Sequence, residues 1–486
     1  MEDNDSVKDK QIEDLKARVA KLEVLFKRSL DQNNADRSEI DRLNAEVATL
    51  RAALAASNKN SNNSSKPPSS DIVKPPKPKG KGRRKRKIGA QKGHKQHKRK
   101  PFDEKEVDKI VELTLDVCPK CNGTLHAIDG SMKKFQQVDW LGRGIIIIEY
   151  RYYRFLCEDC CRTTPTKVSP DIKKAGLFSS NLIATTAYLK GRCHLSYTTL
   201  QSLFSDAFRV NVSTGFLVAQ IRKANRALNP VYDDLVELLP NEEHVHSDET
   251  GWKEKGERRW IWCFRTRQFV VFYISPSRGC MVLEKLLGLD FSGIISSDYF
   301  SAYQKFLRLS EAVGQYCWSH VIREVKWFAE QSDKKTSRWG TRLLEAIRKM
   351  FKTLHRQDEY KSYDTWLLKM RACQKAILKA ARCRVPKDKK AQAISARLQD
   401  KQDEYFRFIE TGIPPTNNLC EQSIRHVVID RKITQGTRSD WGNRWNERIW
   451  SVLATCALQG RNVMDFLKAS VDAFIRKTAP PLLSNG

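Results

Sequence analysis

Four cysteines form two closely spaced pairs, and this spacing is typical of a metal site. Cys118 and Cys121 enclose two residues, Cys157 and Cys160 do the same, and 35 residues separate the two pairs. Four thiolates suit a tetrahedral Zn²⁺ ion, and each short turn can present both of its sulfurs to one ion. We therefore predict a structural Zn²⁺ site, because four protein ligands leave no open position. Free thiols and a redox pair are the alternatives, and Cys161 is a neighbour that breaks the spacing.

Three acidic residues lie at the ends of predicted elements. Asp248 follows the predicted strand 244–247, and Asp298 follows the apolar strand 293–297. Carboxylates on adjacent strands can share Mg²⁺ ions, and two such ions about 4 Å apart can promote cleavage of a phosphodiester. Glu421, near the start of the last helical region, is the best third carboxylate. Asn418 and Glu421 are also spaced as a capping box, so helix capping is the alternative role of Glu421.

Three histidines lie close to these acids in the sequence. His244 and His246 share a strand face with Asp248 by alternation, but we expect them on an exposed strand edge and not as ligands. His320 follows the predicted strand 313–318 and is a better candidate for an accessory contact.

The elements that must position these residues are predicted from periodicity and turn signals. Residues 102–175 hold strand-like runs between the cysteine pairs and form the predicted zinc-binding domain. Residues 176–240 form a predicted helical DNA-binding domain. Its helices are predicted over 179–190, 196–208 and 213–228, with Ser196 and Ser213 as N-caps. The short break at 209–212 indicates a helix-turn-helix, and a plain helical bundle is the alternative.

From residue 243 the pattern changes to strands and predicts an α/β domain with a mixed sheet, and from about 321 to 410 the chain is helical and very basic. Strands are predicted over 244–249, 259–265, 268–274, 293–297 and 313–318, and a helix over 281–287.

The N-terminal region has a different composition. Residues 8–56 are predicted to be a coiled coil, because apolar residues recur with a heptad register from Ile12 to Leu54. We expect this segment to form a homo-oligomer, and a helix packed on its own domain is the alternative. Residues 57–101 are rich in Asn, Ser, Pro, Gly and Lys, so we predict a disordered linker.

The charge of the chain indicates a polyanionic partner. The 486 residues include 87 Lys and Arg against 57 Asp and Glu, a net charge of +30. Residues 74–100 contribute 14 positive charges and no acid, which leaves +16 for the rest. DNA or RNA is the expected partner. A membrane span and a signal peptide are not indicated, and the 13 cysteines fit a reducing cytoplasm, so we expect a cytoplasmic protein.

Several motifs, taken in order, resemble a known family. They are Ser64-Ser65-Lys66-Pro67-Pro68-Ser69-Ser70-Asp71, Gly89-Ala90-Gln91-Lys92-Gly93-His94, the two cysteine pairs, Asp248-Glu249-Thr250-Gly251-Trp252, Ser297-Asp298-Tyr299-Phe300-Ser301-Ala302-Tyr303, Cys317-Trp318-Ser319-His320 and Asn417-Asn418-Leu419-Cys420-Glu421. The chain resembles bacterial transposases of the insertion-sequence family numbered sixty-six, within the DDE, or retroviral-integrase-like, superfamily. The resemblance covers nearly the whole chain.

The resemblance implies a multidomain fold: coiled coil, zinc ribbon, helix-turn-helix-like domain and an RNase H-like catalytic domain. The catalytic domain would span 241–475 and be interrupted by a helical insertion at about 325–410. It implies that Asp248, Asp298 and Glu421 are the DDE triad and hold two Mg²⁺ or Mn²⁺ ions, with Trp318 and His320 as accessory residues. Basic DNA contacts are expected at Arg83, Arg84, Lys85, Arg86, Lys87, Lys92, Arg425 and Arg431. The implied partners are the terminal inverted repeats of an insertion sequence, target DNA and accessory proteins of the same element. The implied location is the bacterial nucleoid.

The expected activity is DNA cleavage at the element ends followed by strand transfer of the 3′-OH. Two alternatives remain at this stage. One is a non-catalytic DNA-binding regulator or inactive transposase remnant, and the other is a nuclease that joins no strands.

Overall fold

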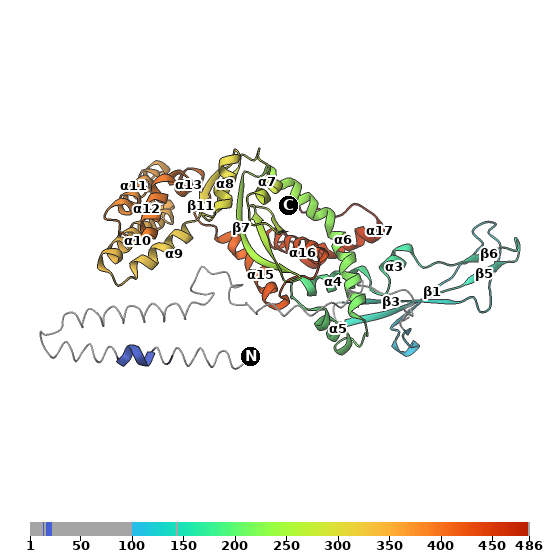
Figure 1. The fold of residues 1–486 in the computed structure, drawn as a ribbon. Helices are drawn as coiled ribbons and strands as arrows, with labels where there is room; N and C mark the ends of the chain where they lie inside the picture. The colour runs from blue at the N-terminus through green and yellow to red at the C-terminus, as the bar shows by residue number, and fades with distance from the viewer. Residues whose placement is uncertain (1–12, 14–15, 22–99, 142–143, 485–486) are drawn as a thin grey trace. The chain divides into compact units, whose positions relative to one another are not determined.

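The structure is a computed structural model that describes residues 13, 16–21, 100–141 and 144–484 (Figure 1). The chain divides into two units, Met1–His94 and Lys95–Gly486, and the elements below belong to the second. The coiled coil expected over 8–56 and the linker expected over 57–101 lie almost entirely outside the described residues, so both stay predictions.

Two small sheets carry the cysteine pairs. The elements of this part are η2 (Glu104–Glu106), β1 (Lys109–Leu113), β2 (Leu125–Ala127), β3 (Lys133–Leu141), β4 (Gly144–Tyr152), β5 (Arg154–Cys157) and β6 (Thr163–Pro165). One sheet has the order β1-β4-β3 and the other the order β2-β5-β6. Cys157 ends β5 and pairs with Leu125 of β2, so the second sheet places one cysteine pair beside the loop that carries the other.

The next helices begin where the sequence places serine caps. They are α3 (Pro170–Ala175), α4 (Ser180–Gly191), α5 (Tyr197–Asp206) and α6 (Thr214–Leu238), followed by η3 (Leu239–Asn241). The side chains of Ser179, Ser196 and Ser213 each accept a backbone N–H in the first turn of the following helix. Helix α6 runs ten residues beyond its predicted end, through Pro230. The Arg448 side chain donates to the backbone and side-chain oxygens of Asn225 and so joins α6 to the C-terminal helices.

A five-stranded mixed sheet forms the centre of the C-terminal part. Its elements are β7 (His244–Glu254), β8 (Glu257–Arg265), β9 (Val270–Ser275), α7 (Met281–Leu287), β10 (Ile294–Ser297), α8 (Ser301–Leu309) and β11 (Val313–Tyr316). The order is β11-β10-β7-β8-β9; β7, β8 and β9 are antiparallel, while β10 is parallel to both β7 and β11. The predicted mixed sheet is therefore confirmed, with β7 at its centre.

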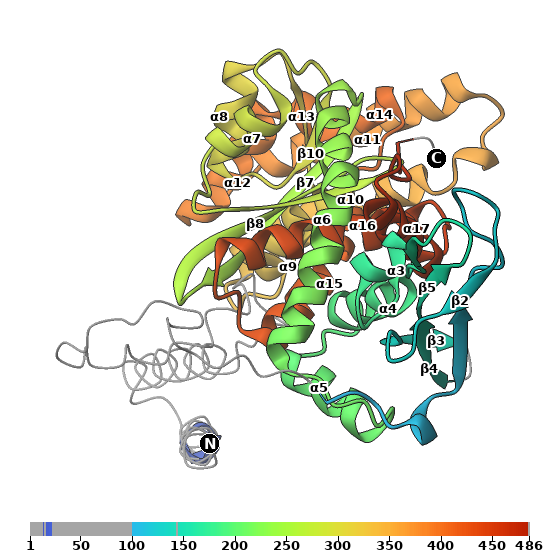
Figure 2. The ribbon, with the colours of Figure 1, turned by 90° about the vertical axis from the view of Figure 1, so that its right-hand side faces the viewer.

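Helices lie on both faces of this sheet. The last helices are α15 (Asn418–Thr434), α16 (Asp440–Leu458) and α17 (Val463–Arg476). Helix α15 packs against β7 and β8, and α16 packs along β9 (Figure 2). Tyr303 of α8 contacts Ser247 and Glu249, which point to the opposite face from Asp248. The sheet is thus the middle of three layers.

Helix α16 closes the edge of the sheet with polar side chains. Thr455, Ser451 and Glu447 are spaced by four residues on one helix face. Their side-chain oxygens accept the N–H groups of Val270, Phe272 and Ile274 at 3.0, 2.9 and 2.6 Å, in that order. Alternate N–H groups of β9, which would otherwise be free at an edge, are therefore paired inside the protein.

The loop after α15 fastens this helix to the end of β7. Thr437 donates its N–H to Lys253 O at 2.9 Å and accepts from Lys255 N at 2.8 Å. Gly436 before it has a φ of +104°, and a Cβ there would lie 2.2 Å from Lys253 O. Only glycine allows the loop this close approach.

A group of helices separates β11 from α15 in the sequence. They are α9 (Trp318–Ala329), α10 (Lys334–Leu354), η4 (Gln357–Glu359), α11 (Tyr363–Arg382), α12 (Lys389–Asp400), α13 (Gln402–Phe406) and α14 (Phe408–Thr411). They share a hydrophobic core of their own, distinct from the core around the five-stranded sheet. Trp318 and Gln315 both donate to Tyr405 O, so this insertion is tied to the sheet beside β11. Among the described residues, every helix is too short or too polar to cross a membrane.

Candidate active site and metal centres

The sheet register brings the two aspartates to the same level of adjacent strands. Ser296 of β10 pairs with His246 of β7, and Asp298 and Asp248 each lie two residues further along. Asp248 Oδ1 accepts the N–H of Glu249 at 2.9 Å, and Asp298 Oδ1 accepts the N–H of Phe300 at 3.0 Å. Both side chains are partly exposed. The parallel pairing of β7 and β10 thus brings Asp248 and Asp298, fifty positions apart in the sequence, to the same level of the sheet.

Glu421, in the first turn of α15, lies within electrostatic range of Asp248. Burial raises the pKa of Asp248 well above its usual range, and the charges of Glu249, Asp298 and Glu421 raise it further. Asp298 and Glu421 therefore both lie within electrostatic range of Asp248, and their negative charges repel its carboxylate. Such a group of carboxylates favours the binding of a cation.

Asn417 joins the start of α15 to the sheet. Its side chain donates to Ser247 O at 2.7 Å, so its Oδ1 accepts from His246 Nδ1 at 3.1 Å. Its backbone N–H donates to the sulfur of Cys317 at 3.1 Å. The residue is 1% exposed. Sequence reasoning gave Asn417 no role, since nothing local distinguishes it from Asn418.

The capping-box alternative for Glu421 is wrong. The N-cap of α15 is Asn417, and no side chain caps the helix there. The side chain of Asn418 instead accepts from Ser319 Oγ at 3.0 Å. Glu421 is thus free of the capping role, and its carboxylate lies within 4.8 Å of donor atoms of Cys317 and His320 at the start of α9.

A fourth carboxylate, that of Glu249, lies on the opposite face of β7 from Asp248. Glu249 is buried, accepts from Tyr303 Oη at 2.6 Å and pairs with Arg278 at 2.7 Å. The guanidinium of Arg278 also lies over the rings of Trp260 and Phe300, at 4.5 and 3.9 Å from their centroids. These contacts fix the turn that carries Asp298. The sequence showed Glu249 only as a neighbour of Asp248, because its partners are distant in the chain.

The two histidines of β7 are not on an exposed edge, and that prediction is wrong. β7 is the central strand, His246 is 4% exposed, and His244 Nε2 lies 2.8 Å from Ser296 Oγ. Burial lowers the pKa of His244 to about 4 and that of His246 to about 3. Both rings are therefore neutral at pH 7 and act in packing and hydrogen bonding.

The two accessory candidates have different surroundings. Trp318 is fully buried and donates Nε1 to Tyr405 O, so it joins α9 to α13 inside the insertion and cannot touch a substrate. His320 lies in the first turn of α9, partly exposed, with Glu421 and Cys317 nearby. Only His320 of this pair is therefore placed to act at the carboxylates.

The residues predicted to contact DNA differ in their exposure. Arg425 is exposed on α15, one turn after Glu421. Arg431 is 8% exposed and donates to Thr250 Oγ1 and to Gly251 O, so a phosphate contact at Arg431 is wrong. The other predicted contacts, Arg83, Arg84, Lys85, Arg86, Lys87 and Lys92, lie outside the described residues.

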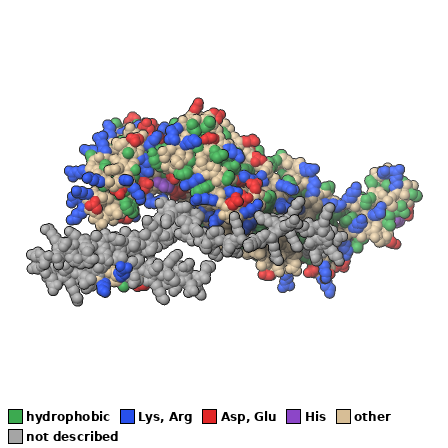
Figure 3. All heavy atoms as spheres, viewed as in Figure 1, with side chains coloured by type: hydrophobic (Ala, Val, Ile, Leu, Met, Phe, Trp, Pro, Cys, Tyr) green, Lys and Arg blue, Asp and Glu red, His purple; other side chains and the backbone are tan. Residues whose placement is uncertain are grey.

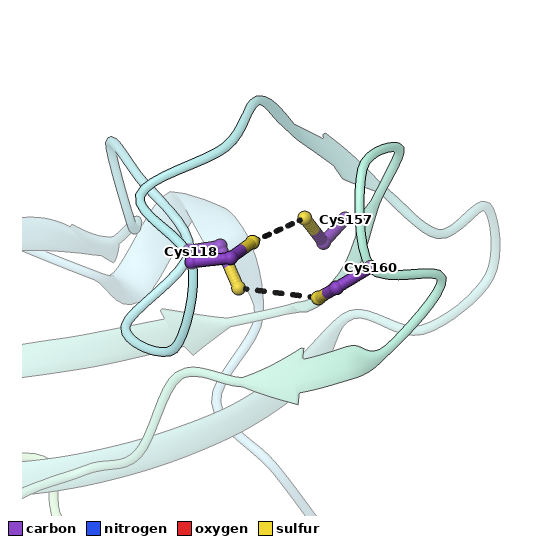
Figure 4. A group of neighbouring side chains, drawn as sticks. Cys118, Cys157 and Cys160 are labelled. Atoms are coloured by element: carbon purple, nitrogen blue, oxygen red, sulfur yellow. Dashed lines mark hydrogen bonds between the residues drawn. The ribbon is translucent and has the colours of Figure 1, made fainter.

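The four cysteines of the two pairs converge. The four sulfur atoms all lie within 4.8 Å of one another. The sulfurs of Cys118 and Cys160 are 3.6 Å apart and those of Cys121 and Cys157 are 3.4 Å apart (Figure 4). In a tetrahedral site with Zn–S bonds of about 2.3 Å the sulfurs are separated by about 3.8 Å, so this group can hold zinc with a small expansion.

Neighbouring groups act differently on the thiols of this site: hydrogen bonds with the other cysteines raise the pKa of Cys121 and of Cys160, whereas that of Cys118 is lowered. Backbone N–H groups of Lys120 and Cys121 lower the pKa of Cys118 to about 6, and so favour the thiolate that binds metal. Cys161 is exposed and its sulfur lies near Glu158 O, outside the group.

Comparison with known families gives the class of the protein. Residues 175–444 match the family described as Transposase IS66 family, and residues 3–100 match a family of unknown function (DUF6444). The first match covers more than half of the chain and identifies a transposase-type protein. The chain belongs to the IS66 transposase family, which confirms the resemblance seen in the motifs.

Two similar proteins come from Sinorhizobium fredii. Uncharacterized protein y4hP is 22% identical over 396 residues, which cover 74% of this chain and 71% of that protein. Uncharacterized protein y4qI is 22% identical over 295 residues, which cover 54% of this chain and 53% of that protein. The match thus spans about half the length of the second relative, and neither name adds an activity.

Proposed function

We propose that the chain is a transposase that cleaves DNA at the ends of an insertion sequence and joins the freed 3′-OH to target DNA. Asp248, Asp298 and Glu421 are its catalytic residues and hold two Mg²⁺ or Mn²⁺ ions. The observation that carries the proposal is the parallel register of β7 and β10, which puts Asp248 level with Asp298, together with the charges of Asp298 and Glu421 that act on Asp248. Carboxylates whose charges repel one another favour the binding of divalent cations between them.

The reaction needs no covalent intermediate with the protein. Water attacks a phosphodiester, the P–O3′ bond breaks, and a 3′-OH and a 5′-phosphate result. The 3′-OH then attacks a target phosphodiester, and the target P–O3′ bond breaks in turn. Bound ions would polarise the phosphate and activate the attacking oxygen. The protein holds the ligands in place, through Asn417 for α15 and through Arg278 for the turn at Asp298.

The sheet topology supports an RNase H-like catalytic core. Three antiparallel strands followed by two parallel strands, with helices on both faces, are the arrangement that the family resemblance implies. The insertion α9–α14 enters between β11 and α15. Asp298 and Glu421 are therefore separated by a folded helical unit.

The surface supports DNA as the substrate. Residues 318–411 contain 23 Lys and Arg against 12 Asp and Glu, and Figure 3 shows many basic side chains over these helices. Arg425 is exposed beside Glu421. A basic surface next to a carboxylate cluster suits a phosphodiester substrate, because it offsets the repulsion between DNA and the acids.

The remaining parts receive supporting roles in this proposal. Zn²⁺ held by Cys118, Cys121, Cys157 and Cys160 stabilises the small sheets and does no chemistry. The helices α5 and α6 and the basic linker position element ends. The N-terminal segment pairs protomers, so that two ends are held together, and accessory proteins of the element assist.

The test is cleavage of a labelled element end in Mg²⁺ by the Asp248→Asn variant. Cleavage should fall by at least about a thousandfold, while DNA binding and the melting temperature stay close to wild type. Asp290→Asn is the matched control, because Asp290 is exposed in the loop before β10. Retained cleavage in Asp248→Asn would reject the assignment. DNA binding without any cleavage by the wild-type chain would favour the non-catalytic alternative.

A further inference from the structure

A second group of donor atoms surrounds Glu421. The sulfur of Cys317, a ring nitrogen of His320 and a carboxylate oxygen of Glu421 all lie within 4.8 Å of one another. Cys317 directly precedes α9, His320 lies in the first turn of α9, and Glu421 lies in the first turn of α15. A thiol, an imidazole and a carboxylate together form a donor set for Zn²⁺ or Co²⁺, whereas Mg²⁺ prefers oxygen ligands.

One of these donors lacks a partner. Nδ1 of His320 is buried and has no hydrogen-bond partner among the described residues. A buried nitrogen in this state is unfavourable unless water or an ion satisfies it. The neighbours of this histidine, Cys317 and Glu421, are metal-binding groups, so a metal ion placed here would have donors from all three residues.

The surrounding contacts hold the two helix starts together. Asn417 N–H donates to Cys317 Sγ at 3.1 Å, and Trp318 N–H donates to Pro415 O at 3.1 Å. Ser319 Oγ donates to Asn418 Oδ1 at 3.0 Å. These bonds fix the distance between the donors of α9 and the donor of α15 without an ion. Such outer contacts are the usual support of a metal site.

We propose that Cys317, His320 and Glu421 bind one Zn²⁺ ion, with a fourth position open to water. The site is separate from the four-cysteine group. It overlaps the proposed catalytic site, because Glu421 belongs to both sets. Zn²⁺ bound here withdraws Glu421 from the aspartates and so competes with Mg²⁺. This competition rests on the proposed function, whereas the zinc site itself does not.

The first experiment counts tightly bound zinc in the full chain. His320→Gln and Cys317→Ser should each hold one Zn²⁺ fewer per chain than wild type, and should keep the ion of the four-cysteine group. His355→Gln, which changes an exposed histidine at the end of α10, should hold as much zinc as wild type. Equal zinc in wild type and His320→Gln would overturn the site. His320 is partly exposed, so this variant remains informative if Cys317→Ser fails to fold.

Cobalt gives a second, spectroscopic readout. In the Co²⁺-loaded chain the thiolate-to-cobalt absorption should decrease in Cys317→Ser and stay unchanged in Cys280→Ser, which alters another buried cysteine. An unchanged band in a folded Cys317→Ser protein would exclude the thiol as a ligand.

The competition is tested by adding Zn²⁺ to cleavage reactions in Mg²⁺. The Zn²⁺ concentration that halves the rate should rise by at least about tenfold in His320→Gln, measured against that variant's own rate. Equal inhibition of both proteins would overturn the overlap. If the wild type cleaves nothing, the proposed function fails, and the zinc count still decides the site.

Discussion

Asn417→Ala is expected to weaken the link between α15 and the sheet. The change removes the acceptor of His246 Nδ1 and the donor to Ser247 O, both inside the protein. A buried group left without its partner costs about 1–3 kcal/mol, so the free energy of unfolding should fall by about 2–6 kcal/mol. No capping bond is lost, because the Asn417 side chain makes none.

The assay is urea unfolding followed by tryptophan fluorescence, with Asn418→Ala as the matched control. Asn418 is exposed and bonds only through Ser319, so its loss should change the free energy of unfolding by no more than about 0.5 kcal/mol. Equal stability of the two variants would refute the view that Asn417 anchors α15.

Two further changes test the packing of α16 on β9. Ser451→Ala leaves the N–H of Phe272 unpaired and should lower the free energy of unfolding by about 1–3 kcal/mol in urea. Ser470→Ala, where the hydroxyl bonds only its own helix, should cost less, and the reverse order would contradict the edge pairing. Burial raises the pKa of Glu447 to about 7 from 4.5. The protonated side chain therefore contributes its full stabilisation of the fold below pH 4.5, and this contribution is lost as the pH rises to 7. Glu447→Gln avoids this loss of about 3 kcal/mol, so its stability relative to wild type should rise between pH 4.5 and 7 and then level off. A pH-independent difference would contradict the shift.

Local signals in the sequence predicted local structure. Ser196 and Ser213 mark helix starts because a cap depends on the next three residues only. The strands of the mixed sheet are also close to their predicted positions, since apolar runs and turns are short-range patterns. Helix α6 is the exception, because it continues through Pro230 and packs against α16 and α17, which come much later in the chain.

Errors arose where the order of strands decides the environment. His246 was expected at an edge, but β10 pairs on the far side of β7 and encloses it. Arg431 was expected to meet phosphate, but α15 packs against β7 and turns the guanidinium to Thr250. Neither pairing leaves a signal in the residues nearby. The carboxylates were found by their positions after strands and by the family resemblance, whereas Asn417 and Arg278 needed the assembled sheet.

The central claim is that three carboxylates share divalent ions. The most direct measurement is a crystal structure of the full chain with Mn²⁺, in which anomalous scattering locates the ions. Mn²⁺ is expected between Asp248, Asp298 and Glu421, and it should be lost in the Asp248→Asn variant. Ordered carboxylates with no Mn²⁺ between them, at a concentration that supports DNA cleavage, would contradict it.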